Sequence, residues 1–107
     1  MNKCEEIETL VNGWIRLNLT AITNDDYDRD LWILERVYQI LQQDADLSWA
    51  IISKIILKDS SGELSHVVGG GILRDFINEF PGKAESYIED NLDKIPGLNE
   101  CLAFSKM

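Results

Sequence analysis

The sequence LWILERVYQILQQDADLSWAIISKIIL occupies residues 31–57 and decides the fold class. On both sides of Asp44-Ala45-Asp46 its apolar residues recur every three or four positions, which is the spacing of amphipathic helices. Asp44 is a favourable N-cap, because its carboxylate can accept from the free N–H groups of a helix start. So short a link predicts an antiparallel hairpin. The predicted buried stripes are Leu31, Leu34, Val37, Tyr38 and Leu41, broadened by Trp32, Ile33 and Ile40, and then Trp49, Ile52, Ile55 and Ile56.

Towards the N-terminus, the same spacing predicts one more amphipathic helix, ending near Leu17. A polar break at residues 20–30 follows it, and we expect the next helix to begin near Asp28 or Asp30, because aspartates favour turns and helix starts. The stripe of the first predicted helix consists of Ile7, Leu10, Val11, Trp14 and Leu17.

Towards the C-terminus, Ser60 and Glu63 have the spacing of a capping box and predict a helix that starts near Ser61. Residues 69–71 are three glycines, each of which costs about 1 kcal/mol in a helix interior. We interpret them as a close approach of two helices or a kink. Helical spacing then continues to Pro81-Gly82 and again to Pro96-Gly97, and a short last turn carries Leu98, Cys101 and Leu102.

Taken together, the sequence predicts an all-α protein with five to six helices, arranged as stacked antiparallel α-hairpins. No segment has the sustained alternation of a strand. The 107 residues match one ordinary domain, so we expect a single helical domain over residues 1–107. Trp14, Trp32 and Trp49 lie among aliphatic residues at helical spacing, and we expect all three in the core.

The charge balance limits the classes of partner. Ten basic and nineteen acidic residues give a formal charge of -9, which disfavours nucleic acid and anionic membranes and favours a basic protein partner. The first residues, 1–8, lack the pattern of an export signal, and no apolar run reaches the roughly 20 residues of a membrane span. We therefore expect a cytoplasmic protein. Oligomeric state stays open.

Over half of the net charge lies in residues 21–46, where seven acids face two bases. Asp26, Asp28 and Asp30 alternate like calcium ligands, but Leu31 and Val37 replace the glycine and glutamate that a calcium loop requires. Tyr27 lies among these carboxylates and could hold a partner's arginine or lysine by cation–π attraction. The predicted partner-binding residues are Asp25, Asp26, Tyr27, Asp28 and Asp30, with Glu35, Asp44 and Asp46 beside them.

No arrangement of residues predicts catalysis, a metal or a cofactor. The glycines at 69–71 lack the lysine and serine or threonine of a phosphate loop. His66 is the only histidine, too few for a zinc site with two remote cysteines, and we expect it at a helix surface. Cys4 and Cys101 are expected to be reduced, with a disulfide between docked termini left open. A pocket that enclosed His66 with Asp59 or Glu63 would instead favour an enzyme.

Glu89 and Asp93 are four residues apart and would share a helix face, which solvent exposure explains as well as glycosidase chemistry does. We therefore assign no catalytic role to this pair.

Three segments resemble the spaced signatures of a family of small bacterial all-helical domains of uncharacterised function. They are Gly13-Trp14-Ile15, residues 47–50 (LSWA) and residues 69–77 (GGGILRDFI). Ile72 and Arg74 stand where that family has proline and glutamate. The resemblance implies a helical fold and no mechanism.

In size, charge and lack of a catalytic set, the chain also resembles immunity proteins, which bacteria pair with secreted or contact-delivered toxins. This resemblance implies that an acidic face binds and neutralises a basic toxin domain, such as a nuclease. The alternative is a non-catalytic helical adaptor or self-associating scaffold, which would use an apolar groove and respond little to salt.

Overall fold

The computed structural model describes residues 3–19, 24–59 and 61–106, and the side chains of residues 4–19, 31–59 and 61–106. No strand occurs in this part of the chain, which confirms the predicted all-α class. Because α4, η1 and α5 follow one another without a break, the described residues form six helical segments. The elements are α1 (Lys3–Leu19), α2 (Asn24–Gln43), α3 (Ala45–Lys58), α4 (Ser65–Val67), η1 (Val68–Leu73, a π-helix), α5 (Arg74–Glu79), α6 (Pro81–Asn91) and α7 (Leu98–Ser105).

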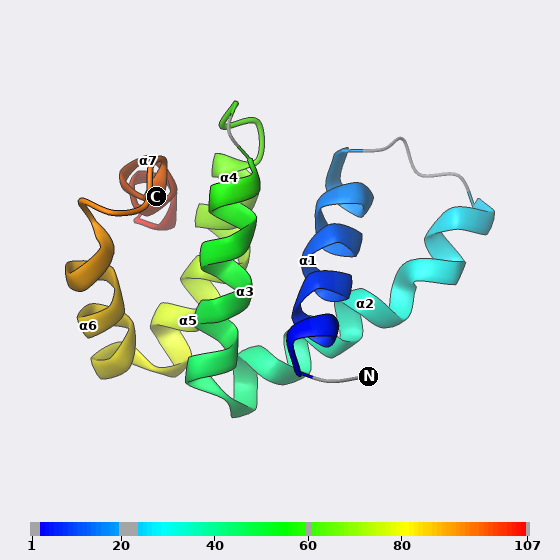
Figure 1. The fold of residues 1–107 in the computed structure, drawn as a ribbon, viewed down its shortest axis with the longest axis horizontal. Helices are drawn as coiled ribbons and strands as arrows, with labels where there is room; N and C mark the ends of the chain where they lie inside the picture. The colour runs from blue at the N-terminus through cyan, green and yellow to red at the C-terminus, as the bar shows by residue number, and fades with distance from the viewer. Residues whose placement is uncertain (1–2, 20–23, 60, 107) are drawn as a thin grey trace.

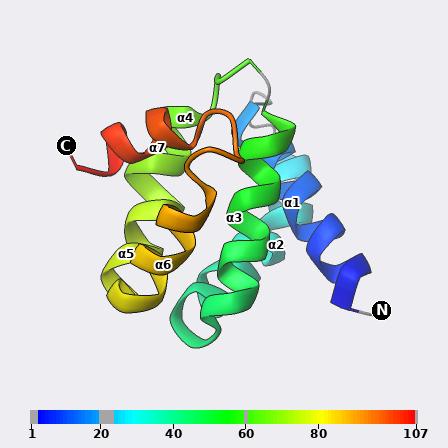
Figure 2. The same ribbon diagram turned by 60° about the vertical axis from the view of Figure 1, so that its left-hand side comes forward.

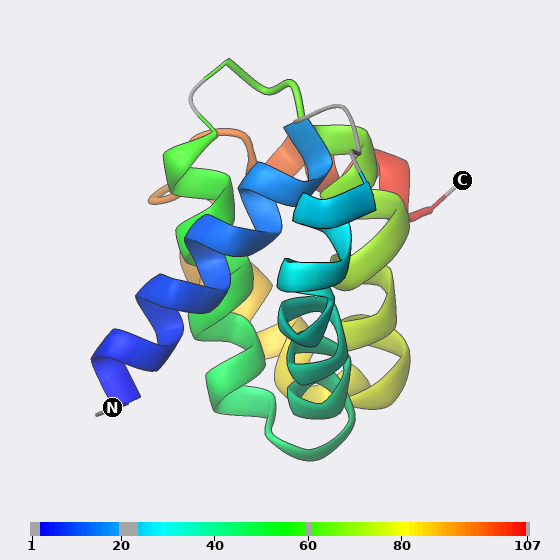
Figure 3. The ribbon, with the colours of Figure 1, turned by 90° about the vertical axis from the view of Figure 1, so that its right-hand side faces the viewer.

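Helix α3 lies in the middle of the molecule, between α1 and α2 on one side and α5, α6 and α7 on the other (Figure 1). The view in Figure 2 shows α5 and α6 side by side next to α3. Figure 3 shows α1 running obliquely across α3 on the opposite side, with α2 beside it. The packing of consecutive helices that the predicted hairpins require occurs between α1 and α2, α2 and α3, and α5 and α6, whereas α7 packs on α4 and η1.

The hydrophobic core surrounds α3, whose residues Ile51, Ile52 and Ile55 are fully buried. Trp49 of α3 stacks on Phe76 of α5 and Tyr87 of α6, with ring centroids 5.9 and 5.5 Å apart. Burying a large apolar side chain stabilises a fold by about 1.5–3 kcal/mol, so these contacts hold the two sides of the molecule to α3. Other core residues include Leu10, Val11, Trp14, Ile33, Val37, Val68, Leu73 and Leu98.

The predicted corner between α2 and α3 is confirmed. Asp44 is the only residue between the two helices, and its backbone is extended at φ -140° and ψ 100°. Its carboxylate accepts a hydrogen bond from the Leu47 N–H at 3.0 Å, as an N-cap does. The Ser48 hydroxyl donates to the backbone oxygens of Ile40 and Asp44, so both helix ends are tied together.

The predicted start of α2 is wrong. The helix begins at Asn24 rather than near Asp28 or Asp30. The aspartates that suggested a turn also suit the first turns of a helix, because the N-terminal end of the helix dipole favours negative charge.

The buried stripe of α2 also differs from the prediction, since Trp32 is 49% exposed and Tyr38 is 52% exposed. The buried face is centred on Ile33, Val37 and Ile40. Successive helix residues are about 100° apart, so Trp32 and Tyr38 fall on opposite edges of this face.

The segment before α4 is a turn rather than the predicted start of a helix near Ser61. Gly62 has a φ of +77°, a conformation that no helix accommodates and that glycine adopts without steric cost. The Asp59 carboxylate accepts from the Leu64 N–H at 2.8 Å and closes the turn. The predicted capping box involves Ser60, which lies outside the described residues.

The three glycines form half of the six-residue π-helix η1, and one of them allows a close helix crossing. A Cβ atom on Gly69 would overlap the backbone oxygen of Cys101 in α7, whereas Gly70 and Gly71 face open space. The predicted close approach of two helices is therefore confirmed at Gly69. The Arg74 guanidinium donates to the backbone oxygens of Phe104 and Ser105 and fixes the far end of α7.

Helix α6 ends at Asn91, four residues before the predicted end of its helical period at Ile95. Gly97, at φ +90°, then reverses the chain into α7, which has eight residues rather than a single turn.

Candidate functional site: acidic surfaces and an aromatic groove

The predicted partner-binding residues are spread along α2 and its corner with α3. Residues 25–30 lie in the first turns of α2, and their side chains are outside the described part of the chain. Asp44 and Asp46 follow the other end of this twenty-residue helix, roughly 20–30 Å away along its axis. Glu35 is exposed between the two ends.

Both aspartates at the corner have partners within the protein. Asp44 is half-buried as the N-cap of α3. Asp46 accepts a hydrogen bond from the Tyr87 hydroxyl and lies 3.7 Å from the Lys83 ammonium. The hydrogen bond to Asp46 raises the pKa of Tyr87. The Asp46 carboxylate therefore connects α3 to α6, whereas the Asp44 carboxylate caps α3 itself.

The carboxylates of α1 are balanced by bases of α2 and α3. Glu6 binds the Arg36 guanidinium at 2.8 Å. Glu8 binds the ammonium groups of Lys54 and Lys58, each at 2.9 Å. Hydrogen bonds from Lys54 and Lys58 lower the pKa of Glu8 to about 2, and the same contact raises the pKa of Lys54. On the α1–α2 side of α3, the negative charges of Glu6 and Glu8 are thus neutralised by bases of the same protein.

Helices α5 and α6 have the opposite character. Between residues 75 and 93 the chain has six acids and one base, Lys83. All six acidic residues are exposed, and within the described chain none of them forms an ion pair or side-chain hydrogen bond. We call these residues the α5–α6 acidic surface: Asp75, Glu79, Glu85, Glu89, Asp90 and Asp93.

Sequence reasoning missed this surface, although counting charges over residues 75–93 would have found a net charge as large as that of residues 21–46. The sequence predicts that Glu89 and Asp93 share a helix face. This prediction is wrong, because α6 ends at Asn91. Asp93 lies in the turn that follows.

A groove of about 300 Å³ lies between α2 and α5 at one edge of the α5–α6 acidic surface. Its wall on α2 contains the exposed Tyr38, and its wall on α5 contains Asp75 and Glu79, which are one helical turn apart. We call it the α2–α5 groove. Its complete lining is Tyr38, Leu41, Gln42, Asp75, Asn78 and Glu79.

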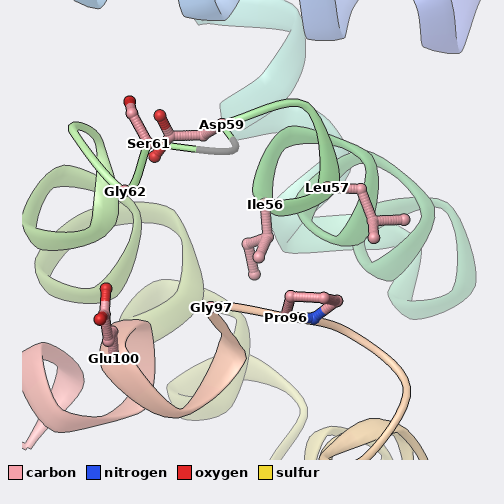
Figure 4. A pocket seen from close by; sticks show the side chains of 8 residues that line it. All are labelled: Ile56, Leu57, Asp59, Ser61, Gly62, Pro96, Gly97 and Glu100. Carbon is pink, nitrogen blue, oxygen red and sulfur yellow. The ribbon is translucent and has the colours of Figure 1, made fainter.

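A second pocket, of about 310 Å³, lies where the end of α3 meets the start of α7 (Figure 4). Ile56 points towards Pro96, and Asp59 and Glu100 approach from opposite sides. Both carboxylates already accept hydrogen bonds, Asp59 from the Leu64 N–H and Glu100 from the Ser65 hydroxyl. The lining is completed by Leu57, Ser61, Gly62 and Gly97.

The arrangement that would have favoured an enzyme, His66 enclosed with Asp59 or Glu63, does not occur in the described chain. His66 is exposed at a helix surface, as expected, and its ring contacts the edge of Phe104. It does not line the pocket that contains Asp59.

The two cysteines are free thiols, as expected. Cys4 is exposed on α1, and Cys101 is buried in α7, where burial raises its pKa. Among the described residues, no three histidine, cysteine or acidic side chains gather closely enough to hold a metal ion.

Fold and surface define the class of this protein as a small all-helical domain with an unbalanced acidic surface. No protein-family model, curated protein or solved structure matches the chain. The resemblance to immunity proteins therefore stays a prediction. Within the described residues, no helix combines the length and the apolar character that crossing a membrane requires.

Proposed function

We propose that the chain is a cytoplasmic immunity protein, a non-catalytic inhibitor that binds the basic domain of a bacterial toxin. The observation that supports this proposal most is the α5–α6 acidic surface, whose six exposed carboxylates have no basic partner in the described chain. A nuclease domain must present positive charge to bind a phosphate backbone. An acidic helical face competes for that same charge.

The contrast between the two sides of the molecule supports the choice of surface. Carboxylates that already pair with Arg36, Lys54 and Lys58 have less attraction left for a partner. Unpaired carboxylates keep their full electrostatic attraction for a basic group. A cluster of negative charges also raises the association rate with a basic protein. The first turns of α2, with Asp25, Asp26 and Asp28, are the second acidic surface to be tested.

The test uses the basic C-terminal toxin domain that the proposal expects a neighbouring reading frame to encode. Its affinity is measured by calorimetry for the wild-type chain and for two charge-matched variants. The first variant combines Glu85→Gln, Glu89→Gln and Asp90→Asn on α6. The second combines Asp25→Asn, Asp26→Asn and Asp28→Asn on α2.

The proposal predicts that the α6 variant raises the Kd about tenfold, since three lost charge contacts at about 0.2–1 kcal/mol each sum to roughly 0.6–3 kcal/mol. Loss with the α2 variant alone would move the site to the first turns of α2 and retain the function. An unchanged Kd for both variants, or no binding by the wild-type chain, would contradict the proposal.

A helical adaptor or self-associating scaffold is the second candidate, because Trp32 and Leu57 expose about half of their side chains. Apolar contacts respond little to ionic strength, whereas exposed charge contacts are screened within about 10 Å at 0.1 M salt. A Kd that stays constant when the salt concentration is raised about tenfold, from roughly 50 to 500 mM, would favour this candidate.

A further inference from the structure

We propose that the α2–α5 groove is a socket for one arginine side chain of a basic protein partner. This inference rests on the proposed function and names the chemistry that its acidic surface recognises. The groove unites an exposed aromatic ring with two carboxylates on a facing helix, in a hollow of about 300 Å³.

Tyr38 provides the face on which a cation can lie. Tyr38 is 52% exposed, in contrast to Trp49, Phe76 and Tyr87, which stack on one another. A guanidinium over a tyrosine ring is attracted by the negative face of the π-system. Leu41, which is buried at the floor of the groove, offers an apolar contact for the methylene stem of such a side chain.

Asp75 and Glu79 provide the negative charge that would balance the positive guanidinium. They are one turn apart on α5, line the same hollow as Tyr38 and have no ion pair among the described residues. Two carboxylates with no internal cation repel each other, and an incoming cation relieves that repulsion. The amides of Gln42 and Asn78 add acceptors for the remaining N–H groups of a guanidinium.

These features favour arginine over lysine. A guanidinium is planar, stacks on an aromatic face and can donate to a carboxylate with two N–H groups at once. An ammonium is a compact, strongly hydrated charge that loses more of its hydration in the same contact. The pocket around Ile56 and Pro96 lacks an aromatic wall, and its two carboxylates already accept internal hydrogen bonds. A third hollow contains Tyr87 and Asp46, but Lys83 already places a cation 3.7 Å from that carboxylate.

The test titrates the isotopically labelled chain with three acetylated, amidated pentapeptides that differ at one central position and are otherwise glycine and serine. That position is arginine, lysine or citrulline, the neutral isostere of arginine. NMR shift changes report both the site and the affinity at low salt. We expect the arginine peptide to shift the signals of Tyr38 and the Gln42 and Asn78 side-chain amides, the lysine peptide to bind less tightly and the citrulline peptide not to bind.

Variants locate the interaction. We expect Tyr38→Ala to weaken arginine-peptide binding about threefold, while Tyr38→Phe keeps it. We expect the double variant Asp75→Asn with Glu79→Gln to weaken it about fivefold. The matched control is Glu63→Gln with Glu100→Gln, which removes the same charge near the other pocket and leaves the affinity unchanged.

Three results would overturn the socket: equal binding of the arginine and citrulline peptides, shift changes outside the groove, or a larger loss with the Glu63 and Glu100 control. Each is separable from failure of the proposed function, which is read from the α6 variant and the whole basic domain. If the α6 variant loses the domain while groove variants do not affect the peptide, the socket alone is wrong. If the groove binds arginine but the Kd of the domain is unchanged by both the α6 and the α2 variants, the proposed function alone is wrong.

Discussion

Acidic residues on the two sides of α3 differ in whether a basic residue of the same protein pairs with them. On the α1–α2 side, Glu6 and Glu8 are bound by bases of neighbouring helices. On the α5–α6 side, six exposed carboxylates have no basic partner in the described chain, and the helices are held by aromatic stacking and by the close crossing at Gly69.

This difference separates the roles of charge in the molecule. Where carboxylates and bases pair, charge contributes to holding helices together, although exposed pairs contribute little each. Where apolar and backbone contacts hold the helices, the carboxylates are not needed for packing and carry a cost in mutual repulsion. The proposed function accounts for these unpaired carboxylates by a basic partner.

The largest effect we predict concerns the packing of the α5–α6 side. Gly69→Ala places a methyl group on the backbone oxygen of Cys101 and against Cβ of Phe104. Overpacking against backbone typically costs 1–3 kcal/mol, so we expect a loss of about 3 kcal/mol in the free energy of unfolding. Urea denaturation measures it.

Gly70 is the matched control, because a Cβ there meets nothing within 4 Å. Gly70→Ala should leave stability unchanged or raise it by up to about 1 kcal/mol, since alanine is the better helix former. Equal destabilisation by both substitutions would show that glycine is required by the π-helix itself and not by the crossing with α7.

A smaller loss is expected at the corner between α2 and α3. Asp44→Ala removes the hydrogen bond to the Leu47 N–H, and N-cap removal typically costs about 1 kcal/mol. Asp44→Asn retains an acceptor and should recover most of the stability. If thermal unfolding shows both variants equally destabilised, the charge of Asp44 rather than its cap hydrogen bond is what stabilises the corner.

The pairing of Glu8 predicts a dependence on pH. Its pKa in the folded protein is about 2, below the ordinary 4.5, so its contribution to stability is full above pH 4.5 and disappears as the pH falls towards 2. The raised pKa of Lys54 means that the pair is also lost at alkaline pH, as Lys54 deprotonates above its ordinary 10.5. The stability difference between the wild-type chain and Glu8→Gln should therefore vanish in acid, and a difference that persists at pH 2 would contradict the pairing.

The smallest effect is expected from the α5–α6 acidic surface itself. Neutralising Glu85, Glu89 and Asp90 should cause no measurable loss of stability and a slight gain at low salt, because it relieves like-charge repulsion one turn apart on α6. A clear loss of stability would mean that these carboxylates hold the helices together. That result would contradict the conclusion that they are not needed for packing.

The fold was largely predictable because helical spacing and the Asp44 cap are local properties of the sequence. The start of α2 was not, since aspartate favours both a turn and a helix start. The exposure of Trp32 and Tyr38 was not either, because a broad apolar helix does not indicate which edge its neighbours leave uncovered.

The α2–α5 groove could not be read from the sequence, because Tyr38 and Asp75 are distant along the chain and meet only when α2 packs against α5. The α6 carboxylates were visible in the sequence as a run of charge. What could not be predicted is that acids of α1 would be paired and those of α6 would not, because pairing depends on which helices become neighbours.

The most direct measurement is an NMR footprint of the basic partner domain on the isotopically labelled chain. We predict that backbone signals of α5 and α6 and the ring signals of Tyr38 change on binding, while those of α1 and the Lys54 to Lys58 turn of α3 do not. A footprint confined to α1 and α3, with α5 and α6 unaffected, would contradict the account.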